Sequence, residues 1–357
     1  MMQQFIAKVG KGQKASKDLT WEEAKQVMRL LIEGQATPVQ VGAFLLAMRI
    51  KMESVTELAA FTAAARQYIP PLSVPKNLPL VDLPTYAGKQ DTFHASVGAA
   101  IIAASAGASI LMHGYEGVPD RPGTAVPLSK LGIPTDLEPK RVTEELTAKG
   151  FAYLDIALYH PPLGRFLDLR RDLGVRSFFH PVAKLLNPAR AQSQVIGLTH
   201  PPYFEKMAEA LNMLGSHRAL IVRGVEGDPE LSIAAASKLI ELREERVVPL
   251  MLQPKDFGLP LGSLQTMAAH PASQATSQGE QEATLLRNIL HNQVRGGQRD
   301  WVVLNAALLL YAAGKASSIS AGVPLAQQAI ESGAAARKLD ELSGSHQLSA
   351  INSEEHA

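Results

Sequence analysis

The stretch LPLVDLPTYAGKQDTFHASVGAAIIAASAGASILMHGYEGVPDRPGTAVPLSKLGI, residues 78–133, decides the architecture of the larger part of this chain. Its apolar runs and helical spacings alternate as strand, turn, helix, strand, loop and helix, which is typical of a parallel sheet covered by helices. The first turn of such a unit usually offers glycine N–H groups and a helix N-terminus to an anion. Here that turn is PTYAG, residues 84–88, with a bulky tyrosine and one glycine. The sequence thus predicts a phosphate-binding scaffold that has lost its usual phosphate ligands.

The composition narrows the class of protein. The chain has 357 residues, 46% apolar residues and a formal net charge of +1, so it has room for two domains and its overall charge selects no class of partner. It contains no cysteine, which excludes disulfides, thiolate metal sites and cysteine nucleophiles. No apolar run is long enough for a signal peptide or a membrane span. We therefore expect a cytoplasmic protein.

The N-terminal part has the pattern of an all-α domain. Asp18 or Thr20 is the expected N-cap of a first helix, because apolar residues then recur at helical spacing. Thr37-Pro38 opens a second helix, and Glu53–Tyr68 forms a third. A proline-rich linker follows. We expect a small helical domain at residues 1–75.

The rest of the chain has the pattern of an α/β domain, predicted at residues 76–159 and 191–345. The candidate strands are Leu80–Leu83, Ser109–His113, Ala152–Ile156, Ser193–Leu198, Ala219–Arg223 and Val247–Leu252. Residues 258–279 are predicted to form a loop, and residues 300–313 and 325–342 two long helices. Residues 346–357 are predicted to be a flexible tail.

Three blocks carry a family resemblance: Asp18–Phe61, His160–Ala189 and Arg299–Ala335. In order and content they resemble the anthranilate phosphoribosyltransferase family, which shares its fold with class II nucleoside phosphorylases. The resemblance implies an α/β fold: a small all-α domain joined to a larger domain with a central, mostly parallel sheet, and a substrate cleft between them. It also implies that residues of about 160–190 return to the small domain, and that the protein is a homodimer through its small domains.

The motifs that bind phosphoribosyl pyrophosphate in this family are degraded here. The Gly-Thr-Gly-Gly-Asp turn is replaced by PTYAG, the Thr-Phe-Asn-Ile-Ser-Thr segment by TFHASV, and the Lys-His-Gly-Asn loop by MHGY. Losing a cation and several backbone donors removes charge-assisted contacts of about 1.5–3 kcal/mol each. No residue is assigned as catalytic. The substrate-binding residues that still match the family are Thr92, Ser96, His113, Gly114, His160 and Arg170. For His160 and Arg170 the alternative is that they pack the domain junction.

The family's magnesium site falls on the run RGVEGDPE, residues 223–230. By resemblance, Asp228 and Glu230 are the candidate ligands, since Mg²⁺ prefers carboxylate oxygens. The alternative is a solvated acidic turn, with Pro229 and Glu230 in the first turn of a helix. Magnesium is expected only if the protein is a transferase.

Positive charge is concentrated in two segments. Residues 1–17 hold four lysines and no acid and are predicted to be a mobile basic arm, while residues 160–190 hold six basic against two acidic residues. A groove across a dimer would combine these charges and could bind a polyanion. The candidate nucleic-acid contacts are Lys8, Lys11, Lys14, Lys17, Arg165, Arg170, Arg171, Arg176, Lys184 and Arg190.

Two functions follow from this pattern. The degraded turn resembles a divergent branch of the family that binds nucleic acid without sequence preference, so the first hypothesis is a nucleic-acid-binding homodimer without a cofactor. The second is a magnesium-dependent enzyme that moves a phosphoribosyl group from phosphoribosyl pyrophosphate to an aromatic amine such as anthranilate.

Overall fold

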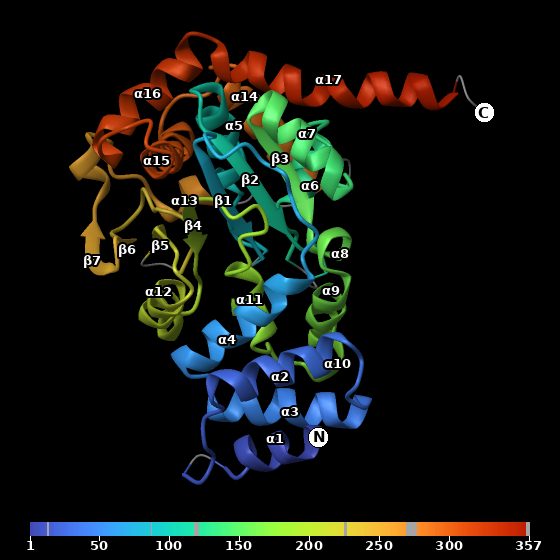
Figure 1. The fold of residues 1–357 in the computed structure, drawn as a ribbon. Coiled ribbons are helices and arrows are strands. Elements are labelled where there is room, and N and C mark those ends of the chain that lie inside the picture. The colour runs from blue at the N-terminus through green and yellow to red at the C-terminus, as the bar shows by residue number, and fades with distance from the viewer. Residues whose placement is uncertain (13, 87, 118–120, 225–226, 269–276, 355–357) are drawn as a thin grey trace.

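The computed structural model describes residues 1–12, 14–86, 88–117, 121–224, 227–268 and 277–354, with the backbone alone for residues 345–354. Figure 1 shows an N-terminal bundle of helices next to a larger part built around a sheet. This is the predicted architecture, a small helical domain with a larger, mostly parallel α/β domain. Among the described residues, none of the helices has the length and apolarity needed to cross a membrane.

Three helices of the N-terminal bundle begin at a capping box. The bundle comprises α1 (Met2–Val9), α2 (Trp21–Ile32), α3 (Pro38–Lys51), α4 (Val55–Ala65) and the 3-10 turn η1 (Arg66–Tyr68). Thr20, Thr37 and Ser54 each form a capping box, in which the side chain accepts from the third helical N–H and the third residue's side chain bonds back. Thr20 is therefore the N-cap of α2, and Asp18 instead pairs with Lys51.

The predicted mobile basic arm is wrong for residues 2–9. They form α1, whose Met2, Phe5 and Val9 are buried against the bundle. Lys8 forms an ion pair with Glu23, so its charge is already partnered. Gly10 and Gly12 lie after the end of α1, and the apolar i, i+3, i+7 spacing of Met2, Phe5 and Val9 decides the structure.

A seven-stranded sheet forms the centre of the larger domain. Its strands are β1 (Leu80–Thr85), β2 (Ser109–Gly114), β3 (Phe151–Asp155), β4 (Ser193–Gly197), β5 (Arg218–Gly224), β6 (Ser237–Arg243) and β7 (Arg246–Leu252). The order is β3-β2-β1-β4-β5-β6-β7; the first five are parallel, and β6 and β7 add an antiparallel hairpin. The strand β6 was not among the strands predicted from the sequence. Its hairpin turns at Glu244 and Glu245, with φ of 50° and 66°, where a sequence signal would normally be Asn-Gly.

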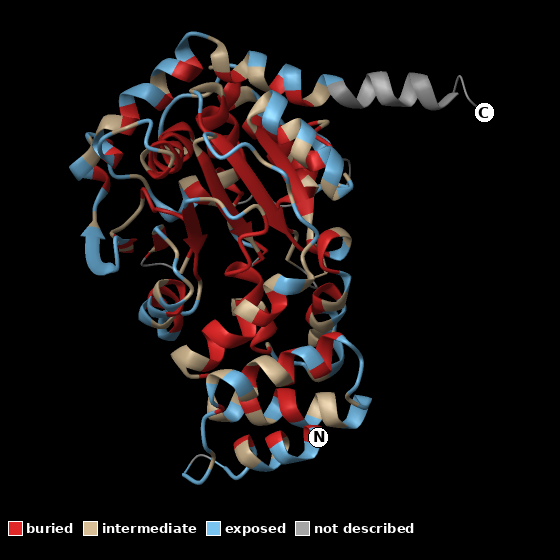
Figure 2. Ribbon diagram, viewed as in Figure 1, coloured by how far each residue is buried: buried red, intermediate tan, exposed pale blue. Residues whose placement is uncertain are grey.

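Helices cover both faces of the sheet. In β2, Ile110 and Met112 join one apolar cluster, and Leu111 joins the other. The first cluster includes α5 (Ala95–Ser105), α6 (Ala125–Lys130), α14 (Gln278–Leu290) and α15 (Gly297–Ala312). The second includes α7 (Pro139–Lys149), α12 (Phe204–Met213) and the N-terminal bundle. Figure 2 shows the parallel strands as mostly buried, the edge strand β7 as exposed and the covering helices as mixed, as expected for a sheet between two layers with an open edge.

Four short helices after β3 run beside the bundle. They are α8 (Ile156–Tyr159), α9 (Pro161–Asp168), α10 (Arg170–Leu173) and α11 (Phe179–Lys184). Phe178 stacks on Phe61 of α4, with ring centroids 4.5 Å apart. Arg66 donates to the carbonyls of Leu185 and Leu186. The exact domain boundaries, including the return of residues 160–190 to the small domain, stay predictions.

The C-terminal region is more divided than predicted. The helix expected at 325–342 is two helices, α16 (Ile319–Glu331) and α17 (Ala334–Glu354), separated at Gly333 with φ of 74°. The helix α17 continues through residues predicted to be a flexible tail, and residues 355–357 lie outside the described part. The predicted loop 258–279 contains α13 (Leu264–Met267), and its residues 269–276 also lie outside. The 3-10 turns η2 (Pro201–Tyr203) and η3 (Pro254–Phe257) complete the fold.

Candidate functional site

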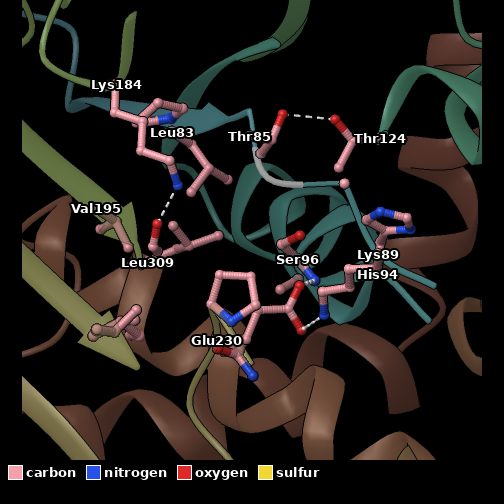
Figure 3. Close-up of a pocket in the computed structure, with 18 residues that line it drawn as sticks. Leu83, Thr85, Lys89, His94, Ser96, Thr124, Lys184, Val195, Glu230 and Leu309 are labelled. Atoms are coloured by element: carbon pink, nitrogen blue, oxygen red, sulfur yellow. Dashed lines mark hydrogen bonds and ion pairs between the residues drawn. The ribbon is translucent and has the colours of Figure 1, made fainter. Parts of the chain in front are cut away.

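Two cavities lie near the carboxyl ends of the parallel strands, where open α/β sheets usually bind ligands. The first has a volume of about 50 Å³ and is lined by β1, β4, β5, α15 and the segment after β1. The second has a volume of about 330 Å³ and is lined by the end of α3, the start of α11 and the loop after β4. Lys184 lines both. Figure 3 shows the first cavity, with Lys184 on one side and Lys89, Ser96 and Glu230 on the other.

The turn after β1 is filled by a buried polar network. The Tyr86 hydroxyl lies 2.8 Å from Nδ1 of His113 and 2.6 Å from the Tyr159 hydroxyl. Nε2 of His113 lies 3.0 Å from Oδ1 of Asp82. The two ring nitrogens of His113 thus face Asp82 and Tyr86. The bulky residue of the degraded turn thus completes a core network, in which burial raises the pKa of Tyr86 well above its ordinary value.

Close packing around this network leaves room only for glycine at position 114. A Cβ there would lie 2.8 Å from both Oγ1 of Thr85 and the hydroxyl of Tyr153, so the strand end has no room for a side chain. Thr85 donates to the carbonyl of His113 and pairs with Thr124 at 2.7 Å. A role of His113 or Gly114 in substrate binding stays a prediction.

Lys89 occupies the centre of the acidic pair. Its Nζ lies 2.9 Å from Oδ1 of Asp228 and 2.8 Å from Oε2 of Glu230. It donates to the carbonyl of Phe93 at 3.0 Å and sits 4.7 Å from the ring centroid of Trp301. Burial alone would lower the pKa of Lys89, but the two carboxylates outweigh that effect and raise it. The lysine is therefore a permanently charged, fully enclosed ammonium.

Residues of the TFHASV segment hold the same acidic pair. Thr92 Oγ1 donates to Oδ2 of Asp228 at 2.6 Å, and the Ser96 N–H donates to Oε1 of Glu230 at 2.9 Å. Asp228 and Glu230 are 7% and 5% exposed, so the alternative of a solvated acidic turn is wrong. The chain continues from this pair without a helix until β6. The third carboxylate of this run, at position 226, lies outside the described residues.

The two substrate-side residues have different surroundings. His160 is fully buried: its Nε2 lies 3.0 Å from the carbonyl of Ala65, and its Nδ1 caps α9 by accepting from the Leu163 N–H. It therefore joins the bundle to the segment after β3. Arg170 is half-buried at the start of α10, and its pKa is lowered by burial and by the charge of Arg121. The structure thus packs His160 in the junction and leaves Arg170 near other cations.

The second cavity is strongly cationic. It is lined by Arg49, Arg121, Arg176 and Lys184, and its described lining contains no carboxylate. Burial and the neighbouring arginines lower the pKa of Arg176 to about 10. Burial and Arg176 lower the pKa of Lys184 to about 7. So many cations around one space repel each other unless an anion enters.

Several buried polar atoms of this cavity also lack a partner among the described residues. They are Nε of Arg121, Oγ of Ser177 and Nε2 of His180. Buried polar atoms without a protein partner are uncommon in folded proteins, and a bound ligand or water is their usual partner. The cavity therefore has the chemistry of an anion-binding site.

The predicted nucleic-acid contacts are dispersed. Lys184 does not lie on an exposed face, because it is buried in α11 with Nζ donating to the carbonyl of Gly197. Lys8 is partnered by Glu23, as described above. The contacts that remain exposed are Lys11, Lys14, Lys17, Arg165, Arg171 and Arg190.

Sequence reasoning missed three residues of the site: Lys89, Arg49 and Arg121. Lys89 follows Gly88 in the degraded turn, and a lysine next to a lost phosphate loop was a usable signal. Arg49 and Arg121 lie more than seventy residues apart, and no local pattern links them. They meet because α3 and the segment after β2 reach the same cavity.

Both parts of the chain match one class of protein, a glycosyl transferase. Residues 3–69 match the helical bundle domain of a glycosyl transferase family, and residues 79–336 match its a/b domain. The anthranilate phosphoribosyltransferase of Burkholderia ambifaria is 35% identical over 327 residues, or 91% of this chain and 93% of that protein. The one of Methanocorpusculum labreanum is 35% identical over 339 residues, or 95% and 97%. This chain therefore belongs to the anthranilate phosphoribosyltransferase family.

Solved structures agree with this family. The anthranilate phosphoribosyltransferase of Thermus thermophilus aligns with a TM-score of 0.84 at 32% identity, covering 96% of this chain and 98% of that one. The Saccharomyces cerevisiae protein, solved in complex with PRPP and Mg, has a TM-score of 0.82 at 20% identity and covers 96% and 97%. The second likeness concerns the fold alone.

The residues present do not fit a magnesium ion at the predicted pair. All four carboxylate oxygens of Asp228 and Glu230 already face a partner, two of them Lys89. Mg²⁺ requires oxygens at about 2.0–2.1 Å in an octahedron, and an ammonium lies where the ion would sit. Among the described residues there is also no cluster of three or more His, Asp or Glu suited to a metal.

Proposed function

We propose that this protein transfers a phosphoribosyl group from phosphoribosyl pyrophosphate to an aromatic amine. What supports the proposal is membership of the family together with the cationic cavity of about 330 Å³ between the bundle and the sheet. That volume lies within the range of small-molecule sites, about 300–1,000 Å³. Because the glycine turn is lost, the phosphates must be bound by Arg49, Arg121 and Arg176.

The cavity is lined by both cationic and apolar side chains, which suit the two substrates of such a reaction. Leu198, Tyr203 and Met207 also line this cavity and supply apolar surface on which an aromatic ring could pack. In the reaction, the bond between ribose C1 and the pyrophosphate oxygen breaks and its electron pair leaves with pyrophosphate. The amine nitrogen forms the new bond to C1 and loses a proton to water. The arginines would stabilise the charge that develops on the leaving group.

The test is an assay of pyrophosphate release with phosphoribosyl pyrophosphate and a panel of aromatic amines, anthranilate first, with magnesium and with EDTA. Arg176→Gln should lower kcat/KM by at least about tenfold, since one charge-assisted contact is worth about 1.5–3 kcal/mol. Arg190→Gln, an exposed arginine outside the cavity lining, is the matched control and should retain activity. The proposal would be refuted if the protein showed no turnover and calorimetry detected no binding of phosphoribosyl pyrophosphate.

A second candidate function is sequence-independent nucleic-acid binding. The observation that favours it is the set of exposed basic residues Arg165, Arg171 and Arg190, none of which has a carboxylate partner among the described residues. Such residues bind phosphate by releasing counterions, so the affinity should fall steeply with salt. Fluorescence anisotropy with labelled single-stranded DNA, duplex DNA and RNA at two salt concentrations is the test.

The two functions separate by which arginines matter. If the protein binds nucleic acid, replacing Arg165 and Arg171 by glutamine should flatten the salt slope, and Arg176→Gln should leave binding nearly unchanged. If the protein is an enzyme, Arg176→Gln should lower its activity, and replacing Arg165 and Arg171 should leave the activity nearly unchanged. An affinity that does not depend on salt would exclude the nucleic-acid function.

We also propose that the protein is a homodimer through its small domain. The helix α3 exposes Val39, Leu46 and Ile50. Their spacing of seven and four residues places them along one side of the helix. Large apolar side chains gathered on one exposed stripe are typical of a protein interface.

A further inference from the structure

The ammonium group of Lys89 has the surroundings of a bound cation. It contacts one oxygen of Asp228, one of Glu230 and the carbonyl of Phe93, all at 2.8–3.0 Å. The contacts to the two carboxylates are ion pairs, and the contact to the carbonyl is a hydrogen bond. The face of Trp301 adds a cation–π contact. The side chain is 5% exposed, so it is almost wholly shielded from bulk water.

The backbone holds Lys89 in this place. Gly88 has φ of +61°, and a Cβ there would lie 2.4 Å from the carbonyl oxygen of Arg121. The Lys89 N–H donates to the carbonyl of Pro122 at 3.0 Å. The turn that follows β1 is thus tied to the segment before α6, and this directs the lysine inward. Figure 3 shows its side chain directed at Glu230.

The two carboxylates are arranged as in a cation-binding site. Because they are buried, water does not stabilise their charges. Two adjacent buried carboxylates without a cation would repel each other strongly. Thr92 and the Ser96 backbone N–H hold the remaining oxygens, so that Oδ1 of Asp228 and Oε2 of Glu230 converge on one point. Lys89 occupies that point.

We propose that Lys89 is a built-in cation that replaces a divalent metal ion between Asp228 and Glu230, so that this site works without magnesium. A lysine carries one charge where Mg²⁺ carries two, but it is attached to the chain and needs no supply of metal. The proposal is independent of the proposed function, because it concerns the charge of the acidic pair and holds whether the anion bound nearby is a substrate or a nucleic acid.

The first test measures metal binding to the full-length protein, with Mn²⁺ as a paramagnetic probe for Mg²⁺. The unaltered protein should bind no Mn²⁺ at this pair, and Mg²⁺ should leave its Tm unchanged. Lys89→Ala should gain one Mn²⁺ per chain, and Mg²⁺ should raise its Tm by several degrees, because the two carboxylates then lack a cation. Lys130→Ala, which removes a partner of Glu280 on the surface, is the matched control and should gain none.

A second substitution in the Lys89→Ala variant tests whether the metal binds at the acidic pair. Adding Glu230→Gln to Lys89→Ala should abolish the gained Mn²⁺ binding. If Lys89→Ala does not fold without metal, refolding it with and without Mn²⁺ gives the answer, since folding that needs Mn²⁺ supports the proposal and no rescue contradicts it. Stoichiometric Mn²⁺ binding to the unaltered protein that is lost in Glu230→Gln would overturn the proposal.

Discussion

Replacing Lys184 by methionine should stabilise this protein, and by an amount that depends on pH. Lys184 is buried, and its surroundings lower its pKa from the ordinary 10.5 to about 7. The folded state therefore binds the lysine proton less tightly than the unfolded state. Between these two pKa values the unfolded chain carries more protons, so stability falls as pH is lowered from 10.5 to about 7, and the penalty is constant below that pH.

The magnitude follows from the two pKa values. Their difference, 10.5 less 7, is about 3.5, and each pKa unit corresponds to about 1.4 kcal/mol. Linkage then gives a penalty of about 5 kcal/mol at pH 6 and about 2 kcal/mol at pH 9. Methionine removes the penalty but also loses the hydrogen bond to the Gly197 carbonyl, worth about 1 kcal/mol. The variant should be more stable by about 4 kcal/mol at pH 6 and about 1 kcal/mol at pH 9.

The assay is urea unfolding of both proteins at pH 6, 7.5 and 9 at constant ionic strength. The control is Lys76→Met, an exposed lysine, whose stability difference should be small at every pH. A difference for Lys184→Met that is the same at pH 6 and pH 9 would refute the reasoning, because it would mean that Lys184 titrates alike in the folded and unfolded states.

Four further predictions follow from single contacts. Gly88→Ala should destabilise the protein by more than about 1 kcal/mol in thermal unfolding, because φ is +61° and a Cβ would meet the Arg121 carbonyl, whereas Gly12→Ala, with open space around it, should cost less. His94→Gln should cost more stability at pH 6 than at pH 9. Burial lowers the pKa of His94, but Glu282 outweighs burial and raises this pKa above 6.5. The ion pair therefore stabilises the fold fully below pH 6.5, and this stabilisation is lost as pH rises through the raised pKa. Ile50→Glu should halve the mass measured by light scattering if α3 forms the dimer interface, and an unchanged mass would assign that interface elsewhere. Pyrophosphate bound at pH 8 should bring a proton onto Lys184, so calorimetry in buffers of different ionisation enthalpy should detect uptake that Lys184→Met lacks.

The sequence alone determined the architecture of this protein and the state of its phosphate motif. Hydrophobic periodicity located five of the parallel-sheet strands to within one or two residues, because a buried parallel strand is a continuous apolar run between turn signals. The resemblance of three blocks identified the family. The replaced glycine turn was visible directly, since a glycine position that carries tyrosine is a local fact. The hairpin strand β6 escaped because it has mixed polarity and its turn uses two glutamates with positive φ.

The tertiary structure alone decided what the charged residues do. Lys8 and Lys184 looked alike in the sequence, yet one pairs with Glu23 on the bundle and the other is buried between two cavities. Asp228 and Glu230 could have been a solvated turn, and they are instead the partners of Lys89, about 140 residues away in the chain. The physical reason is that secondary structure depends on neighbours in sequence, whereas the energy of a charge depends on burial and on the sign of whatever the fold brings within a few ångströms.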